Sequence, residues 1–237
     1  MGKRIIPQRR GKGTQRYLSP SHRFAGKLSY PSRTKEVLKG EIVDLIKSVG
    51  HSAPLMIVKY EDSQVVLLPA PLGVKVGQQV FFGGAEATIG SAIPLENIPL
   101  GSPVCNIEIR PLDNGKLLRA AGTSAQIIAK ENNKVVLKLP SKKQIYLNPQ
   151  CFATVGIVSG VGRLTRPLVK AGNGFYKKKA KGKLVNKVKG VAMNAVDHPH
   201  GKTHRRHRRM SATVRRIGRC PGQKVGLLAA RKTGRGK

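Results

Sequence analysis

Residues 55–70, LMIVKYEDSQVVLLPA, contain the clearest fold signal of the chain. Two short runs rich in Val, Ile and Leu, at 55–60 and 64–70, are separated by the polar triplet at 61–63. Short β-branched and aliphatic runs favour strands, and an acidic break that ends in Ser favours a turn. The stretch therefore predicts an antiparallel β-hairpin.

Similar runs lie on both sides of this hairpin. Asn132-Asn133 and residues 141–143 predict two further turns, and no long amphipathic helix pattern is present. Short strands joined by such turns are typical of small all-β barrels. We therefore predict a mainly β fold of two small barrels, divided near residues 85–95. The further strand-like runs are at residues 41–47, 78–84, 104–111, 117–122, 125–131, 134–140, 144–148 and 152–158.

The charge of the chain is concentrated at its two ends. The sequence has 45 Lys and Arg residues against 11 Asp and Glu, a formal net charge of +34. Residues 1–35 contain 10 basic and no acidic residues, residues 36–160 contain 12 and 10, and residues 161–237 contain 23 and 1. The nets are therefore +10, +2 and +22. Such a surplus repels itself in a compact monomer, so the chain requires a polyanionic partner.

Composition argues against several other classes of protein. No apolar run approaches the roughly 20 residues that a membrane helix requires, and the first residues lack the apolar centre of a secretory signal. Cys105, Cys151 and Cys220 are odd in number and far apart, which fits neither a disulfide framework nor a zinc ribbon. We expect a cytoplasmic protein with reduced thiols and no membrane partner.

The two basic ends are rich in Gly, Pro and Ser and cannot bury enough apolar area to offset the entropy of ordering. By themselves they are expected to be extended and mobile. Their Gly residues allow backbone N–H groups to approach a phosphate, and scattered aromatic rings could stack on bases. This mixture favours folded RNA as the partner. The rings are those of Tyr17, Phe24, Tyr30, Phe175 and Tyr176.

The most unusual stretch is HPHGKTHRRHRR at residues 198–209. Its four His residues have a spacing that resembles a zinc signature. However, the Lys and Arg residues between them would place several positive charges beside the metal ion, and Asp197 is the sole nearby carboxylate. A cation run without alternating acids is also untypical of a solvated surface. RNA contact is therefore favoured over zinc, and we expect no metal site.

Five separated motifs make the chain resemble one protein family. Residues 188–202, VKGVAMNAVDHPHGK, are similar to the hallmark run VRGVAMNPVDHPHGG of the universal ribosomal protein L-two family of the large ribosomal subunit. Residues 220–237, CPGQKVGLLAARKTGRGK, resemble the terminus of its archaeal and eukaryotic branch, and the opening looks archaeal. The opening MGKRIIPQRRGKGT, residues 89–101 and residues 117–141 resemble their family counterparts in the same order.

The resemblance implies a specific organisation and role. It implies a basic extension at 1–35, an OB-fold-like barrel at 36–88, an SH3-like barrel at 89–165 and a second basic extension at 166–237. The implied function is that of a structural constituent of the large subunit that orders ribosomal RNA near the peptidyl-transferase centre and supports subunit association and translation. Expected partners are large-subunit ribosomal RNA, neighbouring ribosomal proteins and the small subunit, without DNA or a cofactor.

The implied position near the peptidyl-transferase centre also raises proton transfer by a His with a pKa of about 6.5. The same resemblance places that reaction in RNA, so we expect no catalytic residue and no enzyme activity. His198 and His200 are instead expected to stack on RNA or to hydrogen-bond to it. The full expected set of RNA-binding residues is Arg4, Arg9, Arg10, Lys12, Arg16, Arg23, Arg163, Arg166, Lys170, Lys177, Lys178, Lys179, Lys189, Asn194, His198, His200, Lys202, Arg205, Arg206, Arg208, Arg209, Arg215, Arg216, Arg219, Lys224, Arg231 and Lys232.

The chain departs from the family pattern at two places. Ala195 stands where the family usually has Pro, and Lys202 and Thr203 stand where it has glycines. Because Gly allows a positive φ and close backbone approach, the expected path over the RNA differs most at Lys202 and Thr203.

Two alternatives from other classes stay open at this point. A DNA-architectural or transcription-associated protein would share the basic ends and an SH3-like barrel, but would not need the run at residues 197–200. A metal-dependent hydrolase would use the four His residues, but lacks carboxylate ligands.

Overall fold

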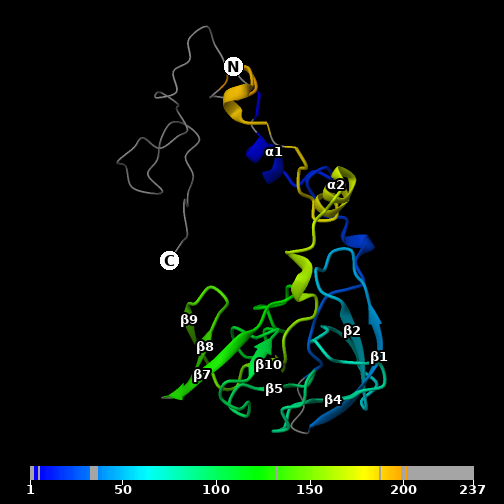
Figure 1. The fold of residues 1–237 in the computed structure, drawn as a ribbon, viewed down its shortest axis with the longest axis vertical. Coiled ribbons are helices and arrows are strands. Elements are labelled where there is room, and N and C mark those ends of the chain that lie inside the picture. Colours follow the sequence, from blue (N-terminus) through cyan, green and yellow to red (C-terminus); the bar gives the residue numbers. More distant parts are fainter. Residues whose placement is uncertain are drawn as a thin grey trace. The chain divides into compact units, whose positions relative to one another are not determined.

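A computed structural model of the chain describes residues 3–4, 6–32, 37–131, 133–186, 188–198 and 201. The described fold is mainly β, as predicted, and contains few and short helices (Figure 1). The strands are β1 (Leu38–Ile46), β2 (Leu55–Tyr60), β3 (Val65–Pro69), β4 (Gln79–Phe82), β5 (Ala92–Pro94), β6 (Pro103–Cys105), β7 (Ala125–Glu131), β8 (Lys134–Lys138), β9 (Gln144–Leu147) and β10 (Phe152–Val155).

The described chain separates into two compact units. Residues 20–171 contain all ten strands, and the described parts of 1–19 and 172–201 form the other unit. The predicted boundaries at residues 35, 88 and 165 stay predictions.

Backbone hydrogen bonds connect the strands in the order β3-β2-β1-β4-β5-β10-β6-β7-β8-β9. The hairpin predicted from residues 55–70 is confirmed, since β2 and β3 pair antiparallel from Leu55↔Pro69 to Lys59↔Val65. A second hairpin, β8–β9, lies at the opposite end of this order (Figure 1). The closure of the two strand groups into OB-fold-like and SH3-like barrels stays a prediction.

Two strand predictions were wrong. Residues 117–122 form no strand beyond an isolated bridge of Leu117 with Ile107, because positive φ angles at Leu118 and Gly122 break the extended backbone. Conversely, the short strand β5 lies near the predicted division at residues 85–95, where no strand was expected, and it pairs with β10. A three-residue strand is too short to give a periodic signal.

The strands surround two separate apolar cores. The first contains Ile42, Met56 and Val58 from the first four strands, and the second contains Ile127 and Leu137 with other residues of β5–β10. Alternating burial along β1 and β7 places these side chains on the inner face. The two cores explain why residues 38–155 fold in spite of basic neighbours on both sides.

Tyr30 belongs to the first core, which corrects its expected role in stacking on RNA bases. Its side chain is 6 % exposed, and its ring centroid lies 5.9 Å from that of Phe82 and 6.4 Å from that of Phe152. Its hydroxyl donates to the carbonyl of Asn106 at 2.5 Å and lies 3.0 Å from Thr154 Oγ1. Burial raises the pKa of Tyr30, so the phenol is the neutral donor at physiological pH.

Arg119 ties the same N-terminal segment to the strands. Its Nη1 donates to the carbonyl of Gly115 at 3.0 Å and its Nη2 to that of Leu28 at 3.5 Å. Burial lowers the pKa of Arg119. The pKa of His51 is also lowered, mainly by burial and to a smaller extent by the positive charge of Arg119. Residues 28–30 are therefore part of the folded unit rather than of a free extension.

Two of the three thiols are described. Cys105 and Cys151 are buried thiols outside any disulfide, as predicted, and burial raises the pKa of Cys105 to about 12. Cys220 lies outside the described residues. Within the described part of the chain, no helix is long and apolar enough to cross a membrane.

Candidate nucleic-acid interface

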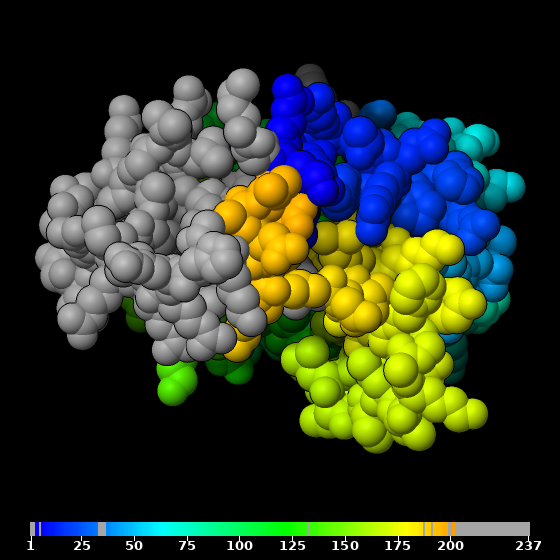
Figure 2. Space-filling view, turned by 90° about the horizontal axis from the view of Figure 1, so that it is seen from above, coloured from blue at the N-terminus to red at the C-terminus, as the bar shows by residue number. Residues whose placement is uncertain are grey.

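The two basic ends of the sequence come together in the unit formed by the described parts of residues 1–19 and 172–201. The backbone N–H of Lys3 donates to the carbonyl of Val196 at 2.7 Å, and its Nζ lies 3.3 Å from Asp197 Oδ1. Figure 2 shows the residues around 195, in orange, directly against the N-terminal residues, in dark blue. Because the ion pair is exposed, it stabilises this contact only weakly.

A second contact between the two ends requires a glycine. Gly182 has a φ of +59°, and a Cβ at this position would lie 2.7 Å from the carbonyl oxygen of Tyr17 and 2.8 Å from the backbone of Leu18 and Ser19. A side chain would therefore be disfavoured by both backbone strain and direct overlap.

We expect Gly182→Ala to weaken this contact by roughly 1–3 kcal/mol, the usual cost of a strained backbone position. The measurement is the rate of limited proteolysis near residues 17–19 and 182, which should rise. Gly172→Ala is the control, because no atom lies within 4 Å of its added Cβ. Equal cleavage of Gly182→Ala and the unmodified protein would contradict this packing.

The ends are not wholly extended, contrary to expectation. They contain α1 (Ile6–Gly11) and α2 (Ala171–Lys179), and neither helix has a buried residue. The cations Lys177, Lys178 and Lys179 occupy the last turn of α2, where the helix dipole favours positive charge. A nine-residue helix without a buried face is marginal by itself, since isolated helices shorter than about 12 residues are barely stable in water.

α2 presents aromatic rings as well as charge. Phe175 is 43 % exposed and Tyr176 is 69 % exposed, with their ring centroids 5.4 Å apart. Lys179 Nζ lies 5.8 Å from the centroid of Phe175. Cations next to open rings are the combination that binds phosphates and unstacked bases together.

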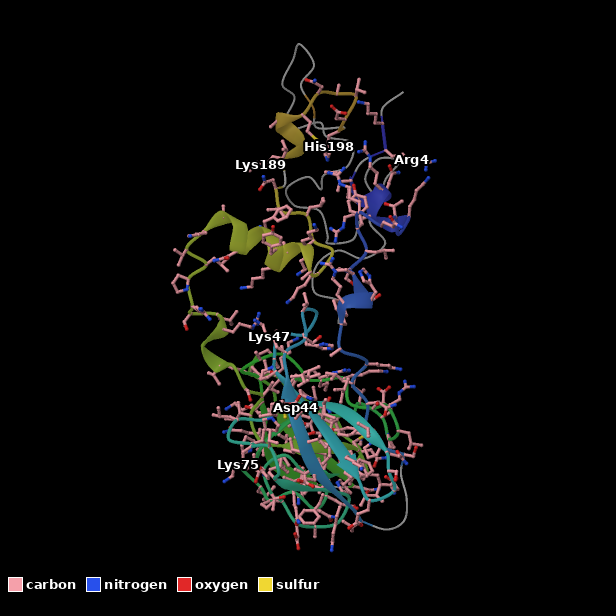
Figure 3. All side chains as sticks on the ribbon, turned by 90° about the vertical axis from the view of Figure 1, so that its right-hand side faces the viewer. Arg4, Asp44, Lys47, Lys75, Lys189 and His198 are labelled. Atoms are coloured by element: carbon pink, nitrogen blue, oxygen red, sulfur yellow. The ribbon has the colours of Figure 1, made fainter. Side chains whose placement is uncertain are left out.

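Most of the described RNA-binding candidates have exposed side chains, in both units; Arg4 and Lys189 are labelled in Figure 3. Arg163 and His198 are half-buried, and the buried Nε of Arg163 has no hydrogen-bond partner among the described residues. The exposed candidates are Arg4, Arg9, Arg10, Lys12, Arg16, Arg23, Arg166, Lys170, Lys177, Lys178, Lys179, Lys189 and Asn194. The candidates outside the described residues are His200, Lys202, Arg205, Arg206, Arg208, Arg209, Arg215, Arg216, Arg219, Lys224, Arg231 and Lys232.

The hallmark run is described as far as His198, together with Gly201. The backbone N–H of His198 donates to the carbonyl of Asn194 at 3.2 Å, and Gly201 donates to the carbonyl of His198 at 2.8 Å. The ring of His198 packs against Gly190, where any Cβ would overlap it. The imidazole is therefore held by the fold of this turn, which leaves part of it for an external contact.

The zinc hypothesis finds no support within the described residues. No group of three or more His, Cys, Asp or Glu side chains that could hold a metal ion occurs in this part of the chain. The other three His residues of the run, at 200, 204 and 207, lie outside the described residues.

A charge difference inside the middle segment escaped the sequence reasoning, which counted residues 36–160 as one block. Residues 36–96 contain 4 basic and 7 acidic residues, and residues 97–160 contain 8 and 3. The nets of −3 and +5 add up to the +2 of the whole segment. A count by strand group would have found it.

Comparison with known proteins agrees with the motifs of the sequence. The family model described as "Ribosomal Proteins L2, C-terminal domain" matches residues 88–218. The chain is similar to "Large ribosomal subunit protein uL2" of Methanothermobacter thermautotrophicus, with 47 % identity over 99 % of both chains. It is 45 % identical to the protein of that name from Haloarcula marismortui, over 100 % of this chain and 99 % of the relative.

The protein of the same name from Natronomonas pharaonis is 44 % identical, over 100 % of this chain and 98 % of the relative. These relatives are all archaeal and match almost from end to end. The chain therefore belongs to the ribosomal protein L2 family of the large ribosomal subunit, in its archaeal-type branch.

Proposed function

We propose that this chain binds large-subunit ribosomal RNA through its two basic ends and holds that RNA in its folded form. The observation that carries the proposal is that almost none of the positive charge of the two ends is balanced by acidic residues within them. Residues 1–35 and 161–237 hold 33 basic residues and one acidic residue, Asp197, which pairs with Lys3. A surface of this composition gains stability by neutralising phosphates and releasing their counterions.

The local structure supports contact with a folded RNA. The helix α2 provides exposed rings for stacking besides its lysine charges. The close contact of Gly182 with the backbone of Tyr17, Leu18 and Ser19 allows the two ends to run side by side.

Family membership makes the chain a structural constituent of the large ribosomal subunit rather than a classical enzyme. Its relatives are large-subunit proteins of archaea, whose ribosomes are cytoplasmic, so the chain is a cytoplasmic ribonucleoprotein component with a role in translation. Ribosomal RNA and other ribosomal proteins are its partners. We further propose that RNA, and not DNA, is the polyanion that the ends contact.

A position near the peptidyl-transferase centre and support of subunit association are finer parts of the proposal, and they rest on the resemblance of residues 188–202. Within that position, His198 orders the turn and contacts RNA without transferring a proton. The packing of its ring on Gly190 supports this role, because an imidazole held in one position cannot easily move within hydrogen-bond distance of a reacting group.

We expect His198→Ala to lower the fraction of large subunits that contain the protein. The subunits that do contain the variant should form peptide bonds at a near-normal rate. The assay is single-turnover peptidyl transfer on gradient-purified subunits whose variant content is measured by mass spectrometry. His200→Ala and Arg205→Ala/Arg206→Ala are the comparison variants. A rate loss of about a hundredfold in fully occupied His198→Ala subunits, absent in the arginine variant, would restore a general-base role.

A further inference from the structure

We propose that the outer face of the β8–β9 hairpin is a second RNA contact, on which an unpaired base of ribosomal RNA stacks on Tyr146. Two lysines on the face of the ring, Lys134 and Lys138, and two in the adjoining turn, Lys142 and Lys143, bind the flanking phosphates. The inference rests on the proposed function and extends it to a strand region in which no RNA-binding residue was predicted from the sequence.

The strand register places Tyr146 between two of these lysines. Val136 pairs directly with Tyr146, and Lys138 pairs with Gln144. Residues two apart on a strand share a face, so Lys134 and Lys138 flank Val136 on the face that bears Tyr146. Their side chains are therefore diagonal neighbours of the ring, at the distance that long side chains can bridge.

The ring of Tyr146 is exposed to solvent, although the strand residue on which it lies is buried. Tyr146 is 63 % exposed, whereas its cross-strand partner Val136 is 5 % exposed. Val135 and Leu137 point to the other side and belong to the second core. The hairpin therefore holds the ring on a packed strand pair, as a stacking platform requires.

The charge around the ring lacks internal partners. Residues 126–147 contain five lysines and a single acid, Glu131. Lys130 Nζ donates to the carbonyl of Glu96 at 2.5 Å. The other four lysines are exposed, and none of them forms an ion pair with a described residue.

The turn itself carries a lysine where glycine is favoured. Lys142 has a φ of +65°, and its backbone N–H donates to the carbonyl of Leu139 at 2.9 Å. A residue other than Gly in the left-handed region is under strain, and such strain is typical of functional sites. The turn therefore carries a long cationic side chain at a position where glycine would fit with less strain.

The β2–β3 hairpin, at the opposite end of the strand order, shows that a turn of this geometry does not require lysines. In β2–β3, Ser63 has a φ of +61° and its N–H donates to the carbonyl of Tyr60 at 3.0 Å, the same pattern as at Lys142. That turn carries the acids Glu61 and Asp62 instead of lysines. The two turns therefore share a geometry and differ in charge.

This difference favours RNA over a protein as the occupant of the β8–β9 face. The strand group that bears the acidic turn, residues 36–96, has a net charge of −3, and the group that bears the basic turn, residues 97–160, has +5. A polyanion would be attracted by the second group and repelled by the first. Exposed aromatic side chains beside cations are also the usual means of binding unpaired bases.

The experiment measures binding of the full-length protein to a large-subunit ribosomal RNA transcript as a function of salt. Lys142→Gly/Lys143→Ala should lower the slope of log K against log salt by about 1.4–1.8, because each phosphate contact contributes about 0.7–0.9. Its melting temperature should not fall, since Gly relieves the strain at position 142. Tyr146→Ala should lower affinity about tenfold, and Tyr146→Phe should restore it.

The matched controls lie on the acidic side. Ser63→Gly in the equivalent turn and Lys59→Ala/Lys75→Ala in the first strand group should leave both affinity and slope unchanged. If the hairpin variants bind the transcript as the unmodified protein does, the proposal is overturned and the face is left to a protein partner. If the unmodified protein itself shows no salt-dependent binding, the proposed function fails first, and the two failures are therefore distinguishable.

Discussion

A five-fold substitution by Gln in the N-terminal end is expected to lower the affinity of the full-length protein for large-subunit ribosomal RNA by about a thousandfold at physiological salt. The substituted residues are Arg4, Arg9, Arg10, Lys12 and Arg16. All five side chains are exposed. If each neutralises one phosphate, the slope of log K against log salt decreases by about 3.5–4.5, and this slope sets the loss of affinity. Filter binding or fluorescence anisotropy over a series of salt concentrations gives both values.

The control replaces Lys39, Lys47, Lys59 and Lys75, which lie in the first strand group with its net charge of −3. Two of them are labelled in Figure 3, together with the neighbouring acid Asp44. This set should change the slope little, although it removes nearly as much charge. Equal losses in the two sets would show that net charge alone controls binding, and a five-fold variant that binds like the unmodified protein would exclude the N-terminal end from the RNA contact.

Tyr30→Ala is expected to destabilise the folded unit by about 3–5 kcal/mol, the usual cost of truncating a large buried aromatic side chain. The change removes a ring that packs against both Phe82 and Phe152, and it leaves the buried hydroxyl of Thr154 without this partner. Urea-induced unfolding of the full-length protein, followed by the circular dichroism of the strands, measures the free energy of unfolding.

Tyr30→Phe separates packing from hydrogen bonding. It keeps the ring and loses the hydroxyl that donates to the carbonyl of Asn106. The expected cost is about 1–2 kcal/mol, the range for one buried hydrogen bond whose partner stays unsatisfied. If Tyr30→Ala had no effect on stability, residues 20–32 would be part of the extension after all.

The sequence predicted most of the strands because their signal is local. The pattern at 55–60 and 125–131 coincides with β2 and β7 to the residue. The turn at Glu61, Asp62 and Ser63 was also found, because acidic residues and Ser favour turns in any context.

Tertiary contacts were beyond the reach of the sequence pattern. Tyr30 looked like an arm residue because its neighbours are polar, and only distant residues such as Asn106 and Thr154 show that it is buried. Leu118 lies in an apolar run, but a positive φ ends the strand there. Neither the long-range partner nor the φ angle leaves a periodic signal in the sequence.

The candidate RNA-binding residues were predicted mainly from charge, and they stay predictions. Residues such as Arg4 and Lys177 are exposed as a phosphate-binding role requires. Tyr146, which we propose as a further contact, was not among these candidates because it lies within a strand pattern, and its exposure depends on the register that pairs it with Val136. Position on a face is a property of the folded sheet, and the spacing of one strand does not specify it.

The central claim, that this chain is an RNA-bound constituent of the large ribosomal subunit, is tested most directly by sedimentation of native cell extract through a low-magnesium gradient. Under these conditions the two subunits separate, and quantitative mass spectrometry can follow the protein across the fractions. We expect the protein to co-migrate with the large subunit at a stoichiometry near one and to leave it after ribonuclease treatment. Recovery at the top of the gradient, or with DNA, would contradict the claim.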